Sequence, residues 1–150
     1  MEEMAARYAH RSVRSVFLYT REAHPGEDYR HHTSMDVKRH HARAFQAEFD
    51  VTRQILLDDL EGTAHRAYGW LPNMTGIMGT GGMIHYTATW TDPADIEGAL
   101  TYALDAQERR PRDKLLPYHS ERLKWRMRDD EKFRARLEKN GPQAVKDFYG

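Results

Sequence analysis

The stretch VFLYTREAHPGED, residues 16–28, decides how the rest of the chain is interpreted. Its first four residues, Val16–Tyr19, are β-branched, aromatic or aliphatic and too few for a helix, and a Pro-Gly pair follows, so they predict a buried strand that enters a turn. Glu22 and His24 come after this strand, at its carboxyl end. In open α/β sheets ligands usually bind at that end, because the loops there hang from a rigid scaffold. The sequence therefore predicts a functional site just after the first strand.

The remaining patterns predict an α/β body. Ser34 suits the N-cap of one helix, and Asp92 followed by Pro93 suits the start of another. Glycines between two short apolar runs over residues 75–86 are typical of a β-hairpin. The expected order is the end of a helix (1–8), a strand (16–19), a helix from Ser34, an extended segment (51–57), a short helix (63–70), the hairpin and a helix from Pro93.

A change in composition divides the chain into a body and a tail. Residues 1–107 are predicted to form the α/β body, and residues 108–150 a charged helical tail. Within the tail, Ser120–Lys139 is predicted to be helical with a narrow apolar edge, and Asp129-Asp130 is a point at which the helix could be interrupted. A helix with so narrow an apolar stripe needs a surface to lie on, which we expect to be the body or a partner subunit.

Charge is distributed unevenly along the chain, although the net charge is zero. Residues 1–107 carry 10 Lys and Arg against 15 Asp and Glu, a net charge of −5, and residues 108–150 carry 13 against 8, a net charge of +5. This asymmetry favours a tail that lies against an acidic body, in the same or a neighbouring subunit. Because no basic patch is interleaved with aromatic residues, we expect no nucleic-acid partner.

The absence of cysteine excludes a disulfide framework and thiol chemistry within these 150 residues. No apolar run approaches the ~18 residues of a membrane span, and Met1–Met4 lacks the basic start and the apolar stretch of a signal peptide. The sequence therefore predicts a cytoplasmic protein that has no membrane partner.

Four segments carry a family resemblance. They are Tyr19-Thr-Arg-Glu22-Ala23-His24-Pro25 with Tyr29, Asp36-Val37-Lys38-Arg39-His40, Leu56-Leu57-Asp58-Asp59 with Ala67-Tyr68-Gly69, and Trp90 near Pro93. Over about residues 16–104, the chain resembles the iodothyronine deiodinases and their bacterial deiodinase-like relatives, a branch of the thioredoxin and peroxiredoxin fold. The resemblance implies an α/β fold with a truncated thioredoxin-like sheet and flanking helices, and the predicted C-terminal helical tail has no counterpart in the family.

One part of the family pattern is missing. Ala88-Thr89 stand where the family tends to have Gly-Pro. More importantly, the family's nucleophile, a selenocysteine or cysteine, follows a strand that would precede residue 1. In a thioredoxin fold that strand is central, so its two neighbours would be left with unpaired backbone groups. A longer native chain, a rearranged sheet or pairing with another subunit would each remedy this, and we expect a homodimer.

The resemblance also implies that Glu22, His24 and His40 surround the reactive centre and act in proton transfer and substrate binding. A histidine two residues from a carboxylate, near a turn, can be held in one tautomer and poised for general acid or base catalysis near neutral pH. Tyr29, Trp70 and Trp90 are the predicted contacts of a small-molecule substrate, although aromatic residues at the last two positions also suit core or loop packing.

Nine histidines among 150 residues also make metal binding an alternative to consider. Glu22, His24 and His40 would form a set of two histidines and one carboxylate, which suits zinc, copper or iron. Adjacent histidines on a helix point about 100° apart, so pairs such as His31-His32 and His40-His41 rarely give two ligands to one ion. We expect no metal and no other cofactor.

These observations favour an enzyme in which acid-base chemistry on a small organic molecule has replaced thiol chemistry. A lyase, isomerase or cyclase step would need no cysteine, and Glu22, His24 and His40 would donate, accept or orient protons. Two further hypotheses stay open. One is a thiol or selenol oxidoreductase whose nucleophile lies upstream or on another chain, and the other is a non-catalytic binding or scaffolding module.

Overall fold

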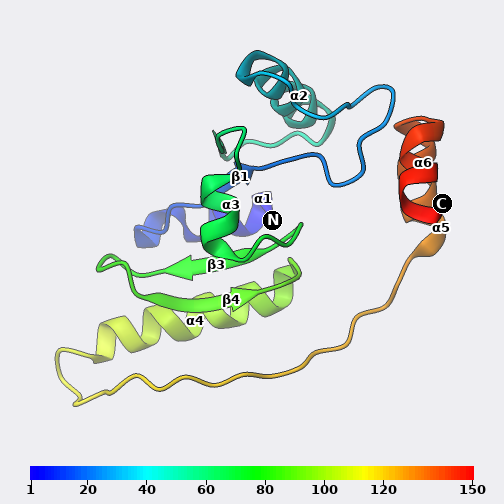
Figure 1. Ribbon diagram of the computed structural model, residues 1–150. Helices are drawn as coiled ribbons and strands as arrows, with labels where there is room; N and C mark the ends of the chain where they lie inside the picture. Colours follow the sequence, from blue (N-terminus) through cyan, green and yellow to red (C-terminus); the bar gives the residue numbers. More distant parts are fainter. The chain divides into compact units, whose positions relative to one another are not determined.

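The computed structural model describes residues 1–150 and has a mixed α/β fold (Figure 1). In chain order the elements are α1 (Glu2–Tyr8), η1 (Ala9–Arg11), β1 (Val16–Tyr19), α2 (Met35–Glu48), β2 (Gln54–Leu57), α3 (Thr63–Tyr68), β3 (Thr75–Met78), β4 (Ile84–Ala88), α4 (Pro93–Arg109), α5 (Asp130–Lys139) and α6 (Pro142–Tyr149). The strands form two separate two-stranded sheets, β1–β2 and β3–β4. The predicted α/β class is confirmed, and so is the order of elements as far as α4.

The chain folds into two compact units whose boundaries differ from the predicted division after residue 107. One unit comprises residues 71–125 together with Met1, and the other comprises residues 2–70 and 126–150. The last two helices therefore belong with the first half of the chain. None of the helices combines the length and the apolar character that a membrane crossing requires.

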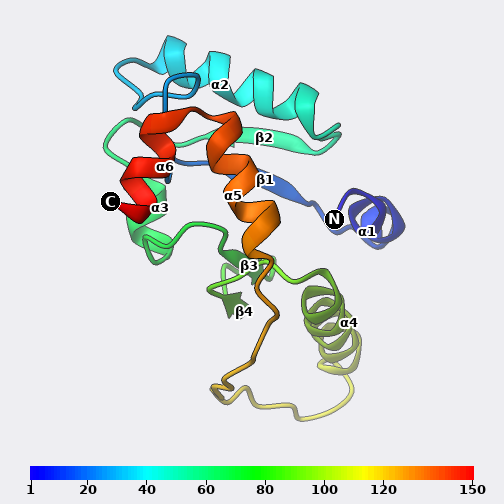
Figure 2. The same ribbon diagram turned by 90° about the vertical axis from the view of Figure 1, so that its right-hand side faces the viewer.

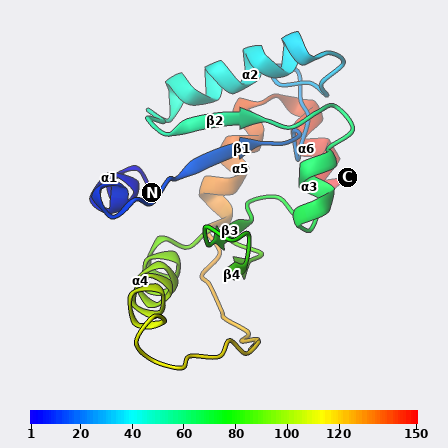
Figure 3. The same ribbon diagram turned by 90° about the vertical axis from the view of Figure 1, so that its left-hand side faces the viewer.

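In the unit of residues 2–70 and 126–150, β1 and β2 run parallel, in a register that pairs Val16 with Gln54 and Tyr19 with Leu57. Parallel neighbours need a crossover connection, and α2 supplies it. Figures 2 and 3 show α2 lying along one side of this sheet. The Phe45 ring on α2 lies 4.8 Å from that of Phe17 and 5.9 Å from that of Tyr19 on β1. Aromatic packing thus fixes the helix over the strand that leads to the predicted site.

Helix α2 begins where its sequence predicts. The Ser34 side chain accepts a hydrogen bond of 3.2 Å from the backbone N–H of Val37, which satisfies one of the unpaired donors of the first turn. The buried residues of the helix are Lys38, His41 and Ala42, at the i, i+3, i+4 spacing of a single face. Two of these buried residues are polar, so this face of the helix is more than an apolar packing surface.

In the unit of residues 71–125, β3 and β4 form the predicted antiparallel hairpin. Helix α4 lies along it (Figure 1) and buries Ile96, Leu100 and Ala103. The Asp92 side chain accepts a hydrogen bond of 2.9 Å from the backbone N–H of Asp95 and caps this helix, as predicted.

The predicted helix over Ser120–Lys139 is wrong in its first half. Residues 110–129 contain neither helix nor strand, and α5 begins only at Asp130, with Asp129 as its N-cap. The physical reason lies in the pattern of residues 123–128, LKWRMR, where apolar and basic residues alternate. Alternation of this kind puts no continuous apolar stripe on a helix, so this segment has no helical face to bury.

The end of the tail lies against the body of the same chain. Helices α5 and α6 pack on each other, with the rings of Phe133 and Phe148 4.8 Å apart (Figure 2). The Arg136 Nη1 and Lys139 Nζ groups both bind the Glu48 Oε1 atom on α2, at 2.9 and 2.5 Å. Arg136 and Lys139 of α5 therefore form the expected contact between a basic tail and an acidic body.

Candidate functional site

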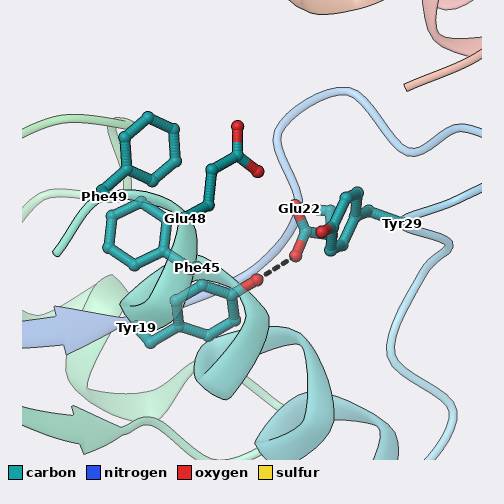
Figure 4. A pocket seen from close by; sticks show the side chains of 6 residues that line it. All are labelled: Tyr19, Glu22, Tyr29, Phe45, Glu48 and Phe49. Carbon is teal, nitrogen blue, oxygen red and sulfur yellow. Dashed lines mark hydrogen bonds between the residues drawn. The ribbon is translucent and has the colours of Figure 1, made fainter. Parts of the chain in front are cut away.

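The centre of the candidate site is Glu22, in the loop that joins β1 to α2. The Tyr19 hydroxyl at the end of β1 donates a hydrogen bond to the Glu22 Oε1 atom (Figure 4). Because Tyr19 is held by the sheet and by α2, this bond fixes the carboxylate at the carboxyl end of the strand. The structure thus places this carboxylate in the loop just after the first strand, where the sequence predicts a site.

Two histidines face the same carboxylate oxygen. The His32 Nε2 atom lies 3.3 Å and the His41 Nδ1 atom 3.4 Å from Glu22 Oε1. Their side chains are only 5% and 8% exposed, and that of Glu22 is 19% exposed. The ring nitrogens that face Glu22 are buried and have no hydrogen-bond partner of good geometry. One ligand atom from each of the three residues lies within 4.8 Å of the others, so the Glu22–His32–His41 cluster is of a size that one metal ion could fill.

Burial controls the protonation of this cluster. Burial lowers the pKa of His32, and nearby Lys38 and His41 lower it further against the opposing effect of Glu22. Burial also raises the pKa of Tyr19, and the hydrogen bond to Glu22 raises it more. Near neutral pH, His32 is therefore a neutral imidazole with a free lone pair, and Tyr19 remains a phenol that donates to Glu22.

A buried lysine supports the helix that carries His41. Lys38 is 2% exposed, and its Nζ atom donates a hydrogen bond of 3.0 Å to the backbone carbonyl of Asp59. Burial lowers the pKa of this lysine, although the carboxylates of Asp58, Asp59 and Glu22 act in the opposite direction. We interpret Lys38 as a link between α2 and the loop after β2, because its amine is enclosed within the protein.

Two adjoining cavities open beside Glu22. The first has a volume of about 160 Å³ and is lined by Tyr19, Glu22, Tyr29, Phe45, Glu48 and Phe49 (Figure 4). The second has a volume of about 140 Å³ and is lined by Glu22, Tyr29, Glu48, Phe49, Arg136, Lys139 and Asn140. Four of the six residues around the first cavity are aromatic, whereas five of the seven around the second are charged or polar, and both cavities are smaller than the roughly 300–1,000 Å³ of typical small-molecule sites.

The structure does not bring the other two predicted catalytic residues to Glu22. The His24 Nδ1 atom lies 3.8 Å from Asp147 Oδ2, and its ring packs edge-on against Phe133 and Phe148 of the last two helices. His40 is exposed on α2, with its ring 6.2 Å from that of His41. Adjacent residues on a helix point about 100° apart, so His41 is turned toward the loop and His40 toward solvent. This angular spacing explains why His41 rather than His40 faces Glu22.

The structure places only one of the three predicted substrate contacts beside the cavities. Tyr29 lines both cavities, and its ring packs edge-on against that of His41 at 5.2 Å. Trp70 stacks on His65 instead, with ring centroids 5.0 Å apart, and lines neither cavity. Trp90 belongs to the unit of residues 71–125, and 43% of it is exposed.

The sequence does not single out His32 or His41 as site residues. One signal for His41 is present: positions 38, 41, 42 and 45 repeat at helical spacing and mark the face of α2 that meets the body. A histidine on that face is buried, and a buried imidazole needs a partner. No comparable local pattern distinguishes His32 from His31, because both lie in an irregular loop.

Comparison with known proteins finds no matching family model, no matching curated protein and no matching solved structure. The function is therefore argued from the Glu22–His32–His41 cluster and from the cavities beside it.

Proposed function

We propose that this protein is an enzyme that binds one divalent transition-metal ion through Glu22, His32 and His41 and acts on a small organic molecule in the adjoining cavities. The observation that carries the proposal is the pair of buried imidazole nitrogens that face one carboxylate oxygen, at 3.3 and 3.4 Å, without a hydrogen bond of good geometry. Buried polar atoms are nearly always satisfied, so two such atoms directed at one point call for a ligand.

The distances within the cluster suit such an ion. Zinc binds histidine nitrogen and carboxylate oxygen at about 2.0–2.2 Å, so two ligands of a tetrahedral ion lie roughly 3.4 Å apart. The separations from Glu22 Oε1 to the two histidine nitrogens, 3.3 and 3.4 Å, have this value. Neutral imidazole is the form that binds metals, and burial of His32 favours it.

The surroundings support the same assignment. Tyr19 hydrogen-bonds to Glu22 and orients its carboxylate, as outer-shell partners of metal ligands commonly do. Two histidines and one carboxylate leave coordination positions open, and a metal in such a site polarises bound water or a substrate oxygen. Glu22 also lines both cavities, so a substrate held between Tyr29 and Phe49 lies beside the metal ligands. Lyase, isomerase or cyclase steps suit this arrangement, because they need polarisation and proton transfer but no thiol.

The thioredoxin-like and deiodinase-like assignment forms the structural part of this proposal. It is supported by the order of strand, crossover helix, parallel strand, helix, hairpin and helix from β1 to α4. We also retain a homodimer and a cytoplasmic location as proposals that rest on the sequence.

A titration with cobalt(II) and zinc(II) tests the metal site. Protein dialysed against a chelator is expected to bind one ion per chain, and bound cobalt is expected to give visible absorption bands. Loss of an outer-shell partner commonly weakens metal affinity about 10–100-fold, so H32Q, H41Q and E22Q should each weaken it by more than about 100-fold and Tyr19→Phe by about tenfold.

Two variants are matched controls. His31→Gln and His40→Gln each replace an exposed histidine that is adjacent to a proposed ligand, and both should bind the metal like the wild type. Unchanged affinity in the His32 and His41 variants would overturn the proposal.

Metal-free acid-base catalysis is the second candidate function. The hydrogen bond from Tyr19 to Glu22 and the close approach of two imidazoles to that carboxylate favour it. A substrate found by screening small organic acids, amines and carbonyl compounds would separate the two candidates. Turnover that survives complete chelation would favour the metal-free site. Turnover that ends with chelation and returns with zinc would favour the metal enzyme.

A binding module and a thiol-dependent enzyme would each give a different result in the same screen. A non-catalytic module would bind a ligand in the cavities without converting it. A thiol or selenol oxidoreductase would show activity only when a nucleophile from outside these 150 residues is supplied, since the chain itself contains no cysteine.

A further inference from the structure

The first of the two cavities beside Glu22 has the size and the walls of a site for one aromatic ring. Its volume is about 160 Å³, and four of its six lining residues are aromatic. Figure 4 shows Tyr19, Phe45 and Phe49 on one side of it and Tyr29 on the other. An apolar cavity of about 150 Å³ is large enough to hold benzene. The part of a ligand that enters this cavity is therefore expected to be a flat apolar group of about that size.

The second cavity differs from the first because α5 adds two cations to its wall. The Arg136 Nη1 and Lys139 Nζ groups both donate to Glu48 Oε1, at 2.9 and 2.5 Å. Neither cation forms an ion pair with another carboxylate. Glu22, the other carboxylate of this cavity, faces the two buried histidines instead. Two positive charges thus share one negative charge, and this wall keeps an excess of one positive charge.

The guanidinium of Arg136 retains donors for a ligand. Only its Nη1 group donates to a protein acceptor, although a guanidinium has five N–H donors in a planar fork that matches a carboxylate. The side chains of Arg136 and Lys139 are 49% and 61% exposed, so a ligand can reach them. The guanidinium also lies 5.0 Å from the centroid of the Phe49 ring, which lines both cavities. A carboxylate bound to Arg136 would therefore stand next to a ring held in the first cavity.

We propose that the substrate is a small aryl carboxylate, whose ring enters the aromatic first cavity and whose carboxylate binds Arg136 and Lys139 in the second. The inference deepens the proposed function and rests on it, because it takes these cavities as the substrate site. Glu22 lines both cavities, so a ligand placed in this way lies beside the residues proposed to bind the metal. A divalent ion there would add to the attraction for an anion.

Three ring compounds of nearly the same shape test the charge of the ligand. Benzoate is an anion, benzamide is neutral and benzylamine is a cation, and each is titrated by NMR into protein that was dialysed against a chelator and then freed of it. Because two half-exposed cations act on it, benzoate is expected to bind about tenfold more tightly than benzamide, and benzylamine more weakly than either. Benzamide binding as tight as that of benzoate, or failure of benzoate to bind at millimolar concentration, would overturn the proposal. Tightest binding of benzylamine would overturn it as well, and would show that Glu22 and Glu48 make the cavities a site for cations.

Two substitutions on α5 locate the carboxylate. Arg136→Gln and Lys139→Gln should each weaken benzoate binding about three- to fivefold, a modest factor because water screens half-exposed charges, and should leave benzamide binding unchanged. The matched controls Arg134→Gln and Lys132→Gln remove exposed cations of the same helix that line neither cavity. Both controls should bind benzoate like the wild type. Equal losses in the controls and the cavity variants would overturn the proposal, because the net charge of the helix alone would explain them.

Glu48→Gln separates an anion site from a purely structural ion pair. The substitution removes the negative charge that competes for Arg136 and Lys139 but keeps an oxygen that accepts hydrogen bonds, so it should strengthen benzoate binding about threefold. Unchanged or weaker binding would overturn the proposal, since the two cations would then serve only to hold Glu48. Arg136→Lys keeps the positive charge and should bind benzoate more tightly than Arg136→Gln does. Equal binding by these two variants would show that the charge at this position is not what binds the carboxylate.

Failure of this inference can be told apart from failure of the metal site. The benzoate titrations use metal-free protein, and the cobalt and zinc titrations use no organic ligand. A protein that binds benzoate but no metal ion keeps its aryl carboxylate site and loses the metal site. A protein that binds the metal ion but not benzoate loses only the aryl carboxylate.

Discussion

Two long irregular segments of this chain behave in opposite ways. The loop between β1 and α2, residues 20–34, has almost no regular structure, yet its groups are fixed by Tyr19, by His41 and by Asn140. The linker of residues 110–129 is equally irregular, yet its apolar side chains contact little. The linker also has a polar contact with a distant residue, the ion pair of Lys124 with Asp95. The comparison therefore teaches that a dense set of such contacts, rather than secondary structure, holds a loop in a position where it can carry a site.

The largest expected effect concerns the packing beneath the ordered loop. Replacing Phe45 by Ala removes a half-buried ring that packs against Phe17, Tyr19 and Phe49, and it should lower the free energy of unfolding by about 2–3 kcal/mol. Urea unfolding followed by circular dichroism measures this loss. Tyr102→Ala, at an aromatic residue on α4 that is 73% exposed, is the control and should change little. Equal losses of stability in the Phe45 and Tyr102 variants would show that burial of the ring does not determine its contribution.

A smaller effect is expected where the last helices close on the ordered loop. A Cβ atom added at Gly26 would lie 2.2 Å from the Asn140 carbonyl oxygen, a backbone atom that cannot turn away. Gly26→Ala should therefore lower the free energy of unfolding by about 2 kcal/mol. It should also weaken metal binding, because the docked helices hold the loop. Gly81→Ala, where an added Cβ meets nothing within 4 Å, is the matched control, and stability equal to wild type in both variants would show that this close contact does not exist.

The third prediction concerns α1, where the Glu2 carboxylate binds Thr52 and Arg53 of the body. Burial raises the pKa of Glu2, but hydrogen bonds from Thr52 and Arg53 outweigh this effect and hold the pKa at about 2, below the ordinary 4.5. Because the pKa is lowered in the folded state, the stabilisation is present above pH 4.5 and is lost as the pH falls toward 2. The pair is partly exposed, so about 1 kcal/mol or less is expected.

Denaturant unfolding at pH 7 and at pH 2.5 measures this contribution. The Glu2→Gln variant should be less stable than wild type at pH 7 and nearly equal to it at pH 2.5. A difference between the two proteins that is the same at both pH values would rule out the titration of Glu2 as its cause. Glu3→Gln, at the neighbouring exposed carboxylate of the same helix, is the control.

The smallest effect is expected in the linker. At a chain concentration low enough to keep the protein monomeric, Trp125→Ser should change the free energy of unfolding by less than about 0.5 kcal/mol, because the side chain is 90% exposed in one chain. A loss above about 1 kcal/mol at low concentration would show that a single chain already buries this residue.

The sequence predicts one side of the candidate site and misses the other. Glu22 follows from a short apolar strand and a turn, because strands and turns are recognisable from neighbouring residues, whereas the prediction of Tyr29 rests on the family resemblance. The prediction of His24 and His40 rests on their spacing to Glu22 along the chain and on the family resemblance. Distance in sequence says little about distance in an irregular loop, and the structure turns His24 toward α5 and α6 instead.

Local signals in the sequence alone determined the strand at residues 16–19, the helix start at Ser34, the hairpin and the capped start of α4, because capping, periodicity and turn chemistry act within a few residues. Only the tertiary structure decided that His32 and His41, rather than His24 and His40, face Glu22. The identity of the histidines at the site depends on how α2 is rotated over β1. It also depends on the hydrogen bonds by which Asn140, far along the chain, positions the loop. Such contacts join residues that no local pattern connects, so their geometry arises only when the chain is packed.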